Sequence, residues 1–524
     1  MSALPKPLII LRANLLSAGM RWRLRQTQDI PAQHRTWRTL VGKMALTQHG
    51  RSLRLDARMR YEQFQSHVPL HSYERIAPLI ERMQCGEADL LWPGQCTHYV
   101  ATAGTTDQPR LLPVTADMSA HFSRAIRDAL LYFTARNGCA GLLSGRRLCL
   151  FDSAQLSPLE LPDNRFTAYA GDLGTIVHQH LPSWMQPPAD ASIPPEPDVD
   201  WSQRLQTLAA ANPADDITVL GGLPHWLQLL ANSVRAQQTS AQTATPASGW
   251  THLRGVFHWG VPFEPFAEEL RRTFGPAERF HEVYPSAEGF IAAQDSVNAH
   301  GLRLMTDAGL FFEFLPWRDY EEGRLAELGA KAVPLEGVRT GVNYLLLLTT
   351  PGGLCRYASG DVVRFTSTKP PRLLYAGRAP LALRAFGEHV LERELTDALV
   401  NVCARHDWQI VNFHVAPVFL SSLTGRIRGL HEWWVELKPR TIETPTGPTL
   451  APALDAELQR LNEEYAARRR LGAMEPPLVR LVMPGVFEQW MRQSQRWGAA
   501  HRMPRSCNDR TIADELAQLA RFSY

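Results

Sequence analysis

The chain has 524 residues, of which 44% are hydrophobic and 20% are charged. This composition is typical of a globular protein and excludes a largely disordered chain. A chain of this length exceeds what one hydrophobic core supports, so we expect one large domain and at least one smaller domain. The 55 basic and 52 acidic residues give a formal net charge of +3, which is too balanced to indicate a nucleic-acid-binding surface.

The seven cysteines form no CxxC pair, so the sequence predicts neither a zinc site nor a disulfide framework, and a cytoplasmic protein is expected. The apolar run at residues 7–11 is too short for a signal-peptide core, and no uncharged apolar run reaches the roughly 18 residues of a membrane span. The basic, apolar N-terminal segment is more typical of a helix that docks on the protein, although such a segment can also rest on a membrane surface.

Apolar residues at helical spacing predict helices across residues 11–82, with a turn at Pro93 and Gly94 and a further helix from Ala116. Residues 187–197 and 237–248 have the composition of surface loops. From Trp250 onward, short β-type runs predict strands at 253–259, 290–293, 311–315, 344–349, 361–366 and 373–375. The tail combines helical patterns at 392–400 and 452–469 with strand patterns at 410–415, 433–437 and 479–482, which predicts a small α+β domain beginning near Arg378.

The first chemical motif is the hydroxyl-rich loop TAGTTDQPR at residues 102–110. Its backbone N–H groups and hydroxyls can face phosphate oxygens, and Arg110 can add positive charge. The loop lacks the GxxxxGK[ST] form of a Walker loop, so taken alone it is more typical of a plain polar turn.

The second motif, YPSAEG at residues 284–289, lies between two apolar runs. A carboxylate beside a glycine is a reasonable magnesium ligand, because magnesium binds one or two carboxylates together with substrate phosphates. Glu288 alone is more simply a helix cap or a surface acid.

The third motif is RYASGD at residues 356–361, between two expected strands. An aspartate at the mouth of a strand can accept hydrogen bonds from both hydroxyls of a ribose. Cys355, just before this motif, is expected to be a small core residue rather than a nucleophile.

In this order, the three motifs resemble the phosphate loop, the Tyr-x-Ser-x-Glu-Gly motif and the Tyr-Arg-x-Gly-Asp type motif of the Gretchen Hagen auxin-responsive family of acyl-acid amido synthetases. That family belongs to the adenylate-forming superfamily. The resemblance covers about residues 40 to 520 and is closest to bacterial members. It extends to further segments, at residues 68–73, 86–92, 258–264, 311–316, 387–388 and 503–505.

The resemblance implies an α/β fold, with a large N-terminal adenylate-forming domain of mixed sheets and helices (residues 1–377) and a small mobile α+β C-terminal domain (residues 378–524). It implies a ligase that uses ATP and magnesium to adenylate a small carboxylic acid and passes the acyl group to an amine, commonly that of an amino acid.

Individual roles follow from the same resemblance. Four loop residues are expected to hold the ATP phosphates: Thr102, Gly104, Thr105 and Thr106. Glu288 is expected to bind magnesium, and Tyr284 and Ser286 to line the pocket. Asp361 is expected to take the ribose hydroxyls, with Arg378 at the hinge near the nucleotide. His258 and Trp259 are expected to border the acyl substrate, and Arg502 to act in catalysis.

The sequence departs from the family pattern at Asp107, Gln108 and Arg110 in the loop and at Ala500 and Arg502 near the C-terminus. An arginine differs from the family's lysine because its planar fork is not a point charge. Two alternatives therefore stay open, an acyl-CoA synthetase-like enzyme and a catalytically silent nucleotide-binding scaffold. The acid and the amine are not defined by the sequence. Arg124 or Arg127 can meet a substrate carboxylate, but a solvated helix face explains these arginines equally well.

Overall fold

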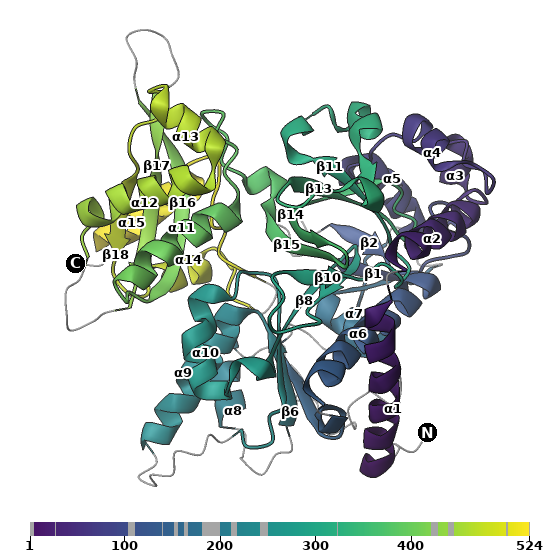
Figure 1. Cartoon of the computed structure of the whole chain (residues 1–524), viewed down its shortest axis with the longest axis horizontal. Helices are drawn as coiled ribbons and strands as arrows, with labels where there is room; N and C mark the ends of the chain where they lie inside the picture. Colours follow the sequence, from purple (N-terminus) through teal and green to yellow (C-terminus); the bar gives the residue numbers. More distant parts are fainter. Residues whose placement is uncertain are drawn as a thin grey trace. The chain divides into compact units, whose positions relative to one another are not determined.

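A computed structural model describes most of the chain, and Figure 1 shows the course of its ribbon. The described residues are 5–26, 28–102, 110–138, 140–150, 156–161, 166–180, 200–210, 217–240, 250–321, 323–420, 428–438, 445–498 and 501–522. The chain forms two compact units. The first comprises Met1–Val261, Glu268–Ser359 and Val363–Leu374, and the second comprises Pro262–Ala267, Gly360–Val362 and Tyr375–Tyr524.

Helices dominate the start of the first unit, as the apolar spacing predicts. They are α1 (Lys6–Arg25), α2 (Asp29–Met44), α3 (Gln48–Ser52), α4 (Tyr61–His67) and α5 (Tyr73–Gln84). In α5 the buried residues Ile76, Ile80 and Met83 recur every three or four positions, which places them on one face of the helix. The later helices up to residue 280 are α6 (Ala116–Asn137), α7 (Leu173–His180), α8 (Trp201–Ala209), α9 (Pro224–Ser240) and α10 (Ala267–Phe274).

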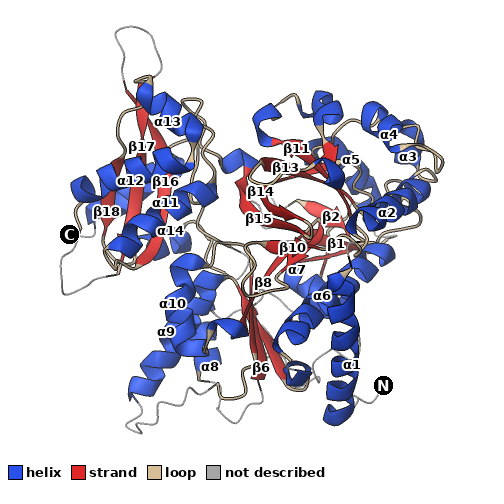
Figure 2. Cartoon of the chain, in the orientation of Figure 1, coloured by secondary structure: helices blue, strands red, loops and turns tan. Residues whose placement is uncertain are grey.

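A large mixed sheet forms the framework of the first unit (Figure 2). Its described strands follow the order β12-β11-β13-β14-β15-β10-β9-β8-β7-β6-β3. Their bounds are β3 (Arg146–Cys149), β6 (Ile217–Gly222), β7 (Gly255–His258), β8 (Phe280–Ser286), β9 (Gly289–Ala293), β10 (Leu302–Leu304), β11 (Phe311–Pro316), β12 (Val333–Pro334), β13 (Asn343–Thr349), β14 (Tyr357–Thr368) and β15 (Pro371–Arg378). Strands β3, β6, β7 and β8 are mutually parallel, whereas β8 and β9 form an antiparallel hairpin.

A smaller sheet has the described order β2-β1-β5-β4. Its strands are β1 (His98–Ala101), β2 (Leu111–Pro113), β4 (Ser157–Pro158) and β5 (Tyr169–Gly171). Helix α6 begins directly after β2, where Thr115 caps it by accepting a hydrogen bond from the backbone N–H of Met118 at 3.1 Å. Gly138 ends the helix in the left-handed conformation, with φ of 64°. Helix α6 is therefore fixed at both ends.

The second unit contains an α+β core, as expected from the sequence of the tail. Strands β16 (Ile410–Leu420) and β17 (Arg428–Leu437) are antiparallel, and β18 (Leu478–Val482) joins β17 in parallel. The helices are α11 (Glu392–Arg405), α12 (Gly447–Leu461), α13 (Glu463–Arg470), α14 (Val486–Gln493) and α15 (Thr511–Phe522). The core contains buried residues from the helices and the sheet, such as Leu399, Trp433 and Leu454.

The α/β fold class is confirmed, but several expected bounds were wrong. The helical pattern at 452–469 is two helices, because Asn462 interrupts it and its side chain caps α13 by accepting from the Tyr465 N–H at 2.7 Å. Helix α9 continues to Ser240, so residues 237–240 are not a loop. The remaining residues 241–248, and the expected loop at 187–197, lie outside the described residues.

Asp361 was also misplaced. Strand β14 begins at Tyr357, so Asp361 lies inside the strand rather than at its mouth. The alternation of buried and partly exposed residues along β14 keeps Ser359 and Asp361 on the buried side. Within the described part of the chain, every helix is too short or too polar to span a bilayer.

Candidate active site

The loop expected to hold phosphates is closed at its base by two hydrogen bonds. The N–H of Thr102 donates to the carbonyl of Arg110 at 2.8 Å, and the Thr102 hydroxyl accepts from the N–H of Arg110 at 3.2 Å. These bonds extend the β1–β2 hairpin to the pair Thr102 and Arg110. The other residues expected to bind phosphate lie outside the described residues, namely Gly104, Thr105 and Thr106. The same holds for the two loop residues that differ from the family pattern, Asp107 and Gln108.

The guanidinium of Arg110 is already bound by other side chains of the protein. It forms an ion pair with Glu74 at 2.7 Å and lies over the ring of Tyr73, 5.1 Å from the centroid. The Tyr73 hydroxyl in turn accepts from the N–H of Leu111 at 3.2 Å. These contacts tie the base of the loop to α5, and a phosphate that binds Arg110 would have to compete with Glu74.

Glu288 lies in the tight turn between β8 and β9. Its exposed fraction is 7%, so it is a buried carboxylate and not the surface acid of the simpler interpretation. Gly289, with φ of 150°, follows it; a Cβ there would lie 2.7 Å from Leu310. Ser286 stabilises the turn, because its hydroxyl donates to the carbonyl of Gly289 at 3.0 Å. Tyr284 is buried in β8, so the structure brings all three expected residues of this motif together.

His121 of α6 supports this turn and was not identified from the sequence. Its Nε2 accepts from the N–H of Phe290 at 2.9 Å, and its Nδ1 donates to the carbonyl of Ala308 at 2.9 Å. Burial lowers the pKa of His121 to about 4, so the ring is neutral at pH 7. The only sequence signal was a histidine on the apolar face of a helix, which is usually a core residue.

His258 and Trp259 lie where the parallel strands β6 and β7 end, an edge at which open α/β sheets commonly bind ligands. His258 is 3% exposed, and burial, with the nearby charge of Arg271, lowers its pKa to about 3. The Trp259 ring lies against Gly221, where a Cβ would be 3.5 Å from the ring. Trp259 therefore packs against the end of β6, and His258 is neutral.

In the second unit, Asp361 and Arg378 form an ion pair with Oδ1 and Nε 3.3 Å apart. Asp361 is 9% exposed. Arg378 therefore neutralises the carboxylate that was expected to bind ribose.

Arg502 belongs to the same neighbourhood. Its Nη2 donates to the Tyr375 hydroxyl at 2.9 Å, and its guanidinium lies 5.6 Å from the centroid of that ring. Burial disfavours the charged form, but Tyr375, Glu392 and Asp361 together hold the pKa of Arg502 above its usual value. Arg502 is thus a fixed cation beside the Asp361 pair. Ala500 lies outside the described residues.

Arg356, the first residue of the third motif, has a structural role. It is fully buried, and its Nε and Nη2 donate to the two carboxylate oxygens of Glu313 at 3.1 and 2.9 Å. The other donors reach the carbonyls of Gln65, Val68 and Gly329. Neighbouring Cys355 is buried too, which raises the pKa of its thiol to about 12 and agrees with a core residue.

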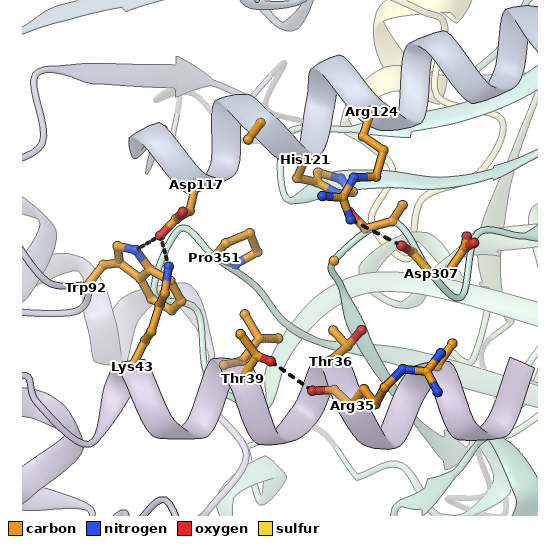
Figure 3. A pocket seen from close by; sticks show the side chains of 15 residues that line it. Arg35, Thr36, Thr39, Lys43, Trp92, Asp117, His121, Arg124, Asp307 and Pro351 are labelled. Carbon is orange, nitrogen blue, oxygen red and sulfur yellow. Dashed lines mark hydrogen bonds and ion pairs between the residues drawn. The ribbon is translucent and has the colours of Figure 1, made fainter. Parts of the chain in front are cut away.

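A pocket of about 340 Å³ lies between α2 and α6 (Figure 3). Arg124 lines it, together with His121, Asp307, Pro351 and Trp92, whereas His258 and Trp259 do not. Arg127, the other arginine considered for a substrate carboxylate, is bound to Asp128 at 2.8 Å. Through His121, the pocket wall is connected to the backbone that follows Glu288.

No group of three histidine, cysteine, aspartate or glutamate side chains could hold a metal ion among the described residues. A magnesium ion that is also bound by substrate phosphates needs fewer protein ligands. The buried Glu288 carboxylate fits that requirement as a single hard oxygen ligand.

Family models match three consecutive parts of the chain. The GH3 family N-terminal domain matches residues 25–278, the central domain residues 303–378 and the C-terminal domain residues 393–511. The chain belongs to the GH3 family. The family predicted from the three motifs is therefore confirmed.

Curated GH3 proteins of plants are among its relatives. The chain is 22% identical over 517 residues to indole-3-acetic acid-amido synthetase GH3.15 of Arabidopsis thaliana, which covers 86% of this chain and 85% of that protein. It is 29% identical over 213 residues to the probable indole-3-acetic acid-amido synthetase GH3.1 of the same plant, covering 39% of this chain and 34% of the relative. Such shorter matches span between 33% and 42% of the curated relatives.

Solved structures share the fold. The GH3.15 acyl acid amido synthetase has a TM-score of 0.70 at 18% identity and covers 94% of both chains. A 2-hydroxyisobutyryl-CoA ligase has a TM-score of 0.57 at 15% identity, with 95% and 92% covered. This GH3 chain therefore has the fold of adenylate-forming enzymes.

Proposed function

We propose that the chain is an ATP- and magnesium-dependent ligase that adenylates a small carboxylic acid and transfers the acyl group to an amine, of amino acid type. The observation that carries this proposal is the buried Glu288 carboxylate of the β8–β9 turn in a chain of the GH3 family. Ser286 and His121 stabilise the backbone of that turn through Gly289 and Phe290. A cytoplasmic location goes with the proposal, supported by the free thiols of the cysteines in the described residues.

In the first half-reaction, an oxygen of the substrate carboxylate attacks the α-phosphorus of ATP. The bond to the bridging oxygen breaks and pyrophosphate leaves, giving an acyl-adenylate. Magnesium, when bound, would supply positive charge at the phosphate oxygens. Glu288 would hold the ion, Thr102 and the residues Gly104, Thr105 and Thr106 would bind the phosphates, and Tyr284 would line the pocket.

In the second half-reaction, the nitrogen of the amine attacks the acyl carbon and the bond to AMP breaks. The nitrogen loses its proton, and an amide forms. Neutral His258 and Trp259 would border the acyl group, because an uncharged wall suits its apolar part. Asp361 would hold the ribose hydroxyls, and Arg502 would supply a fixed positive charge near the phosphate. The domain boundary at residues 377 and 378, with Arg378 at the hinge, is part of the same proposal.

Two other functions remain candidates. An acyl-CoA synthetase shares the first half-reaction, and the fold of the 2-hydroxyisobutyryl-CoA ligase is the observation that favours it. A silent nucleotide-binding scaffold is favoured by the departures at Asp107, Gln108, Ala500 and Arg502 and by the ion pair that occupies Arg110.

The test is pyrophosphate release by the purified protein, with benzoate-, indole- and alkyl-type acids screened against amino acids and coenzyme A. We expect acid-dependent release that is lost in Glu288→Ala and Asp361→Ala. Glu321→Ala is the matched control, because Glu321 is an exposed carboxylate paired with Arg324. Mass spectrometry of the product then distinguishes an amide from a thioester.

Release that is unchanged in Glu288→Ala would contradict the assignment of the site. A protein that binds ATP but releases no pyrophosphate with any acid would instead support the silent scaffold.

A further inference from the structure

Helix α1 packs against the first unit through one face only. Ala13, Ser17 and Met20 are its buried residues. Ser17 forms a hydrogen bond with Thr134 of α6 at 2.5 Å, and Arg23 forms ion pairs with Asp128 and Asp307 at 3.1 and 2.6 Å. The inner face is therefore the docking face expected for this segment.

The opposite face carries a second apolar stripe. The exposed fractions are 49% for Leu8, 56% for Leu11, 67% for Leu15 and 65% for Trp22. With about 100° between successive residues, these four side chains fall within an arc of about 60° around the helix axis. Scattered exposed leucines are ordinary, but a continuous stripe of this kind marks an interaction surface.

The charges of α1 are all positive. Between Lys6 and Arg25 the helix has five basic residues and no aspartate or glutamate. Arg12 is exposed on one side of the stripe, and Arg21 and Arg25 are exposed on the other. An apolar stripe with Leu and Trp, bordered by arginines, is the pattern of a helix that lies in the interface of a bilayer.

We propose that the outer face of α1 docks on the surface of an anionic lipid bilayer. Leu8, Leu11, Leu15 and Trp22 enter the boundary between headgroups and acyl chains, and the flanking arginines contact lipid phosphates. The helix lies on the membrane and does not cross it, in agreement with the described helices. This surface function is independent of the proposed ligase activity.

A second copy of the chain is the competing occupant. Leucines spaced by three and four residues also suit a pair of helices. However, an interface between two copies of α1 would have only positively charged side chains on both sides, and these would repel each other. The negative charge of an anionic membrane is complementary to the positive charge of α1. The charge pattern therefore favours the lipid surface.

The experiment is co-sedimentation of the full chain with phosphatidylcholine vesicles that contain or lack phosphatidylglycerol. We expect binding to the anionic vesicles, with an affinity at least tenfold lower for Leu11→Ser/Leu15→Ser and for Arg21→Glu/Arg25→Glu. Leu471→Ser is the matched control, because Leu471 is 75% exposed in the second unit. Circular dichroism and the unfolding temperature should not change in any variant, since the substituted side chains are exposed.

Equal sedimentation of the wild-type protein with and without anionic vesicles would overturn the proposal, as would equal binding by the Leu11→Ser/Leu15→Ser variant. A dimer in analytical ultracentrifugation that this variant abolishes, without vesicle binding, would assign the stripe to a second copy instead. Pyrophosphate release is measured separately, so a failure of the ligase assignment leaves the membrane result readable.

Discussion

The carboxylate Oδ1 of Asp361 lies 3.3 Å from the Nε of Arg378, and both residues belong to the second unit. The pair gives Asp361 a structural task in addition to the hydrogen bonds to a ribose proposed above, since its carboxylate also balances the charge of a partly buried arginine. A substitution at Asp361 therefore tests nucleotide binding and the orientation of Arg378 together.

Replacement Asp361→Asn keeps the shape of the side chain and removes its charge. Hydrogen bonds to a charged group contribute about 1.5–3 kcal/mol, so we expect the KM for ATP to rise by about 10- to 100-fold. ATP–pyrophosphate exchange measures this value. Arg378→Lys is the companion variant, which retains a cation and should change KM less. An unchanged KM in Asp361→Asn would remove Asp361 from the ribose site.

Replacement Glu288→Gln removes the negative charge from the β8–β9 turn at almost constant volume. We expect kcat to fall on the order of 100-fold, because the phosphate charge would lose its magnesium-mediated compensation. The magnesium concentration needed for half-maximal rate should rise as well, which a purely structural role would not produce. Glu321→Gln at the exposed pair with Arg324 is expected to change neither quantity.

Buried neutral histidines make stability depend on pH. Burial lowers the pKa of His121, His71 and His414 to about 4, from an ordinary value of 6.5. As pH falls below about 6.5, the unfolded chain binds protons before the folded chain does, so the free energy of unfolding decreases until about pH 4. Each histidine contributes up to about 3 kcal/mol to this loss, at about 1.36 kcal/mol for each pKa unit.

Urea unfolding over this pH range measures the effect. His121→Ala should make the free energy of unfolding less dependent on pH, by the contribution of one histidine. His67→Ala, at an exposed histidine, is the control and should leave this pH dependence as it is. A pH dependence that does not change in His121→Ala would show that His121 is not held neutral.

Replacement Arg356→Lys should destabilise the first unit strongly. The lysine retains the charge but cannot donate to both oxygens of Glu313 and to three carbonyls at once. Disrupting a buried ion pair costs about 3–5 kcal/mol, so a clear fall in unfolding temperature is expected by calorimetry. Arg324→Lys, at an exposed pair, is the matched substitution and should be nearly neutral.

The fold class and the family could be predicted because both depend on local patterns. The apolar runs of β11 and β13 and the motif around Glu288 are continuous in the sequence. His121 could not be found, since its role depends on contacts with Phe290 and Ala308, which are distant in the chain. The spacing of the leucines in α1 does not show which face of the helix docks on the protein, so the exposure of Leu11 and Leu15 required the structure.

The position of Asp361 was misjudged for a different reason. Small and polar residues at 358–361 are typical of a loop, but the ladder of β14 extends through them. Gly104, Thr105 and Thr106 lie outside the described residues, so their roles stay predictions. The structure was thus needed mainly to place buried polar side chains, such as those of His121 and Asp361.

The backbone of Arg356 has a φ of 45°, a left-handed value that glycine adopts most readily. The side chain nevertheless binds four residues in three segments, so a glycine at this position would remove the cation that balances the buried Glu313 carboxylate. In an alignment of related chains, positions 313 and 356 should therefore change together or not at all. A relative that has lost only one of the two would need a new partner for the survivor.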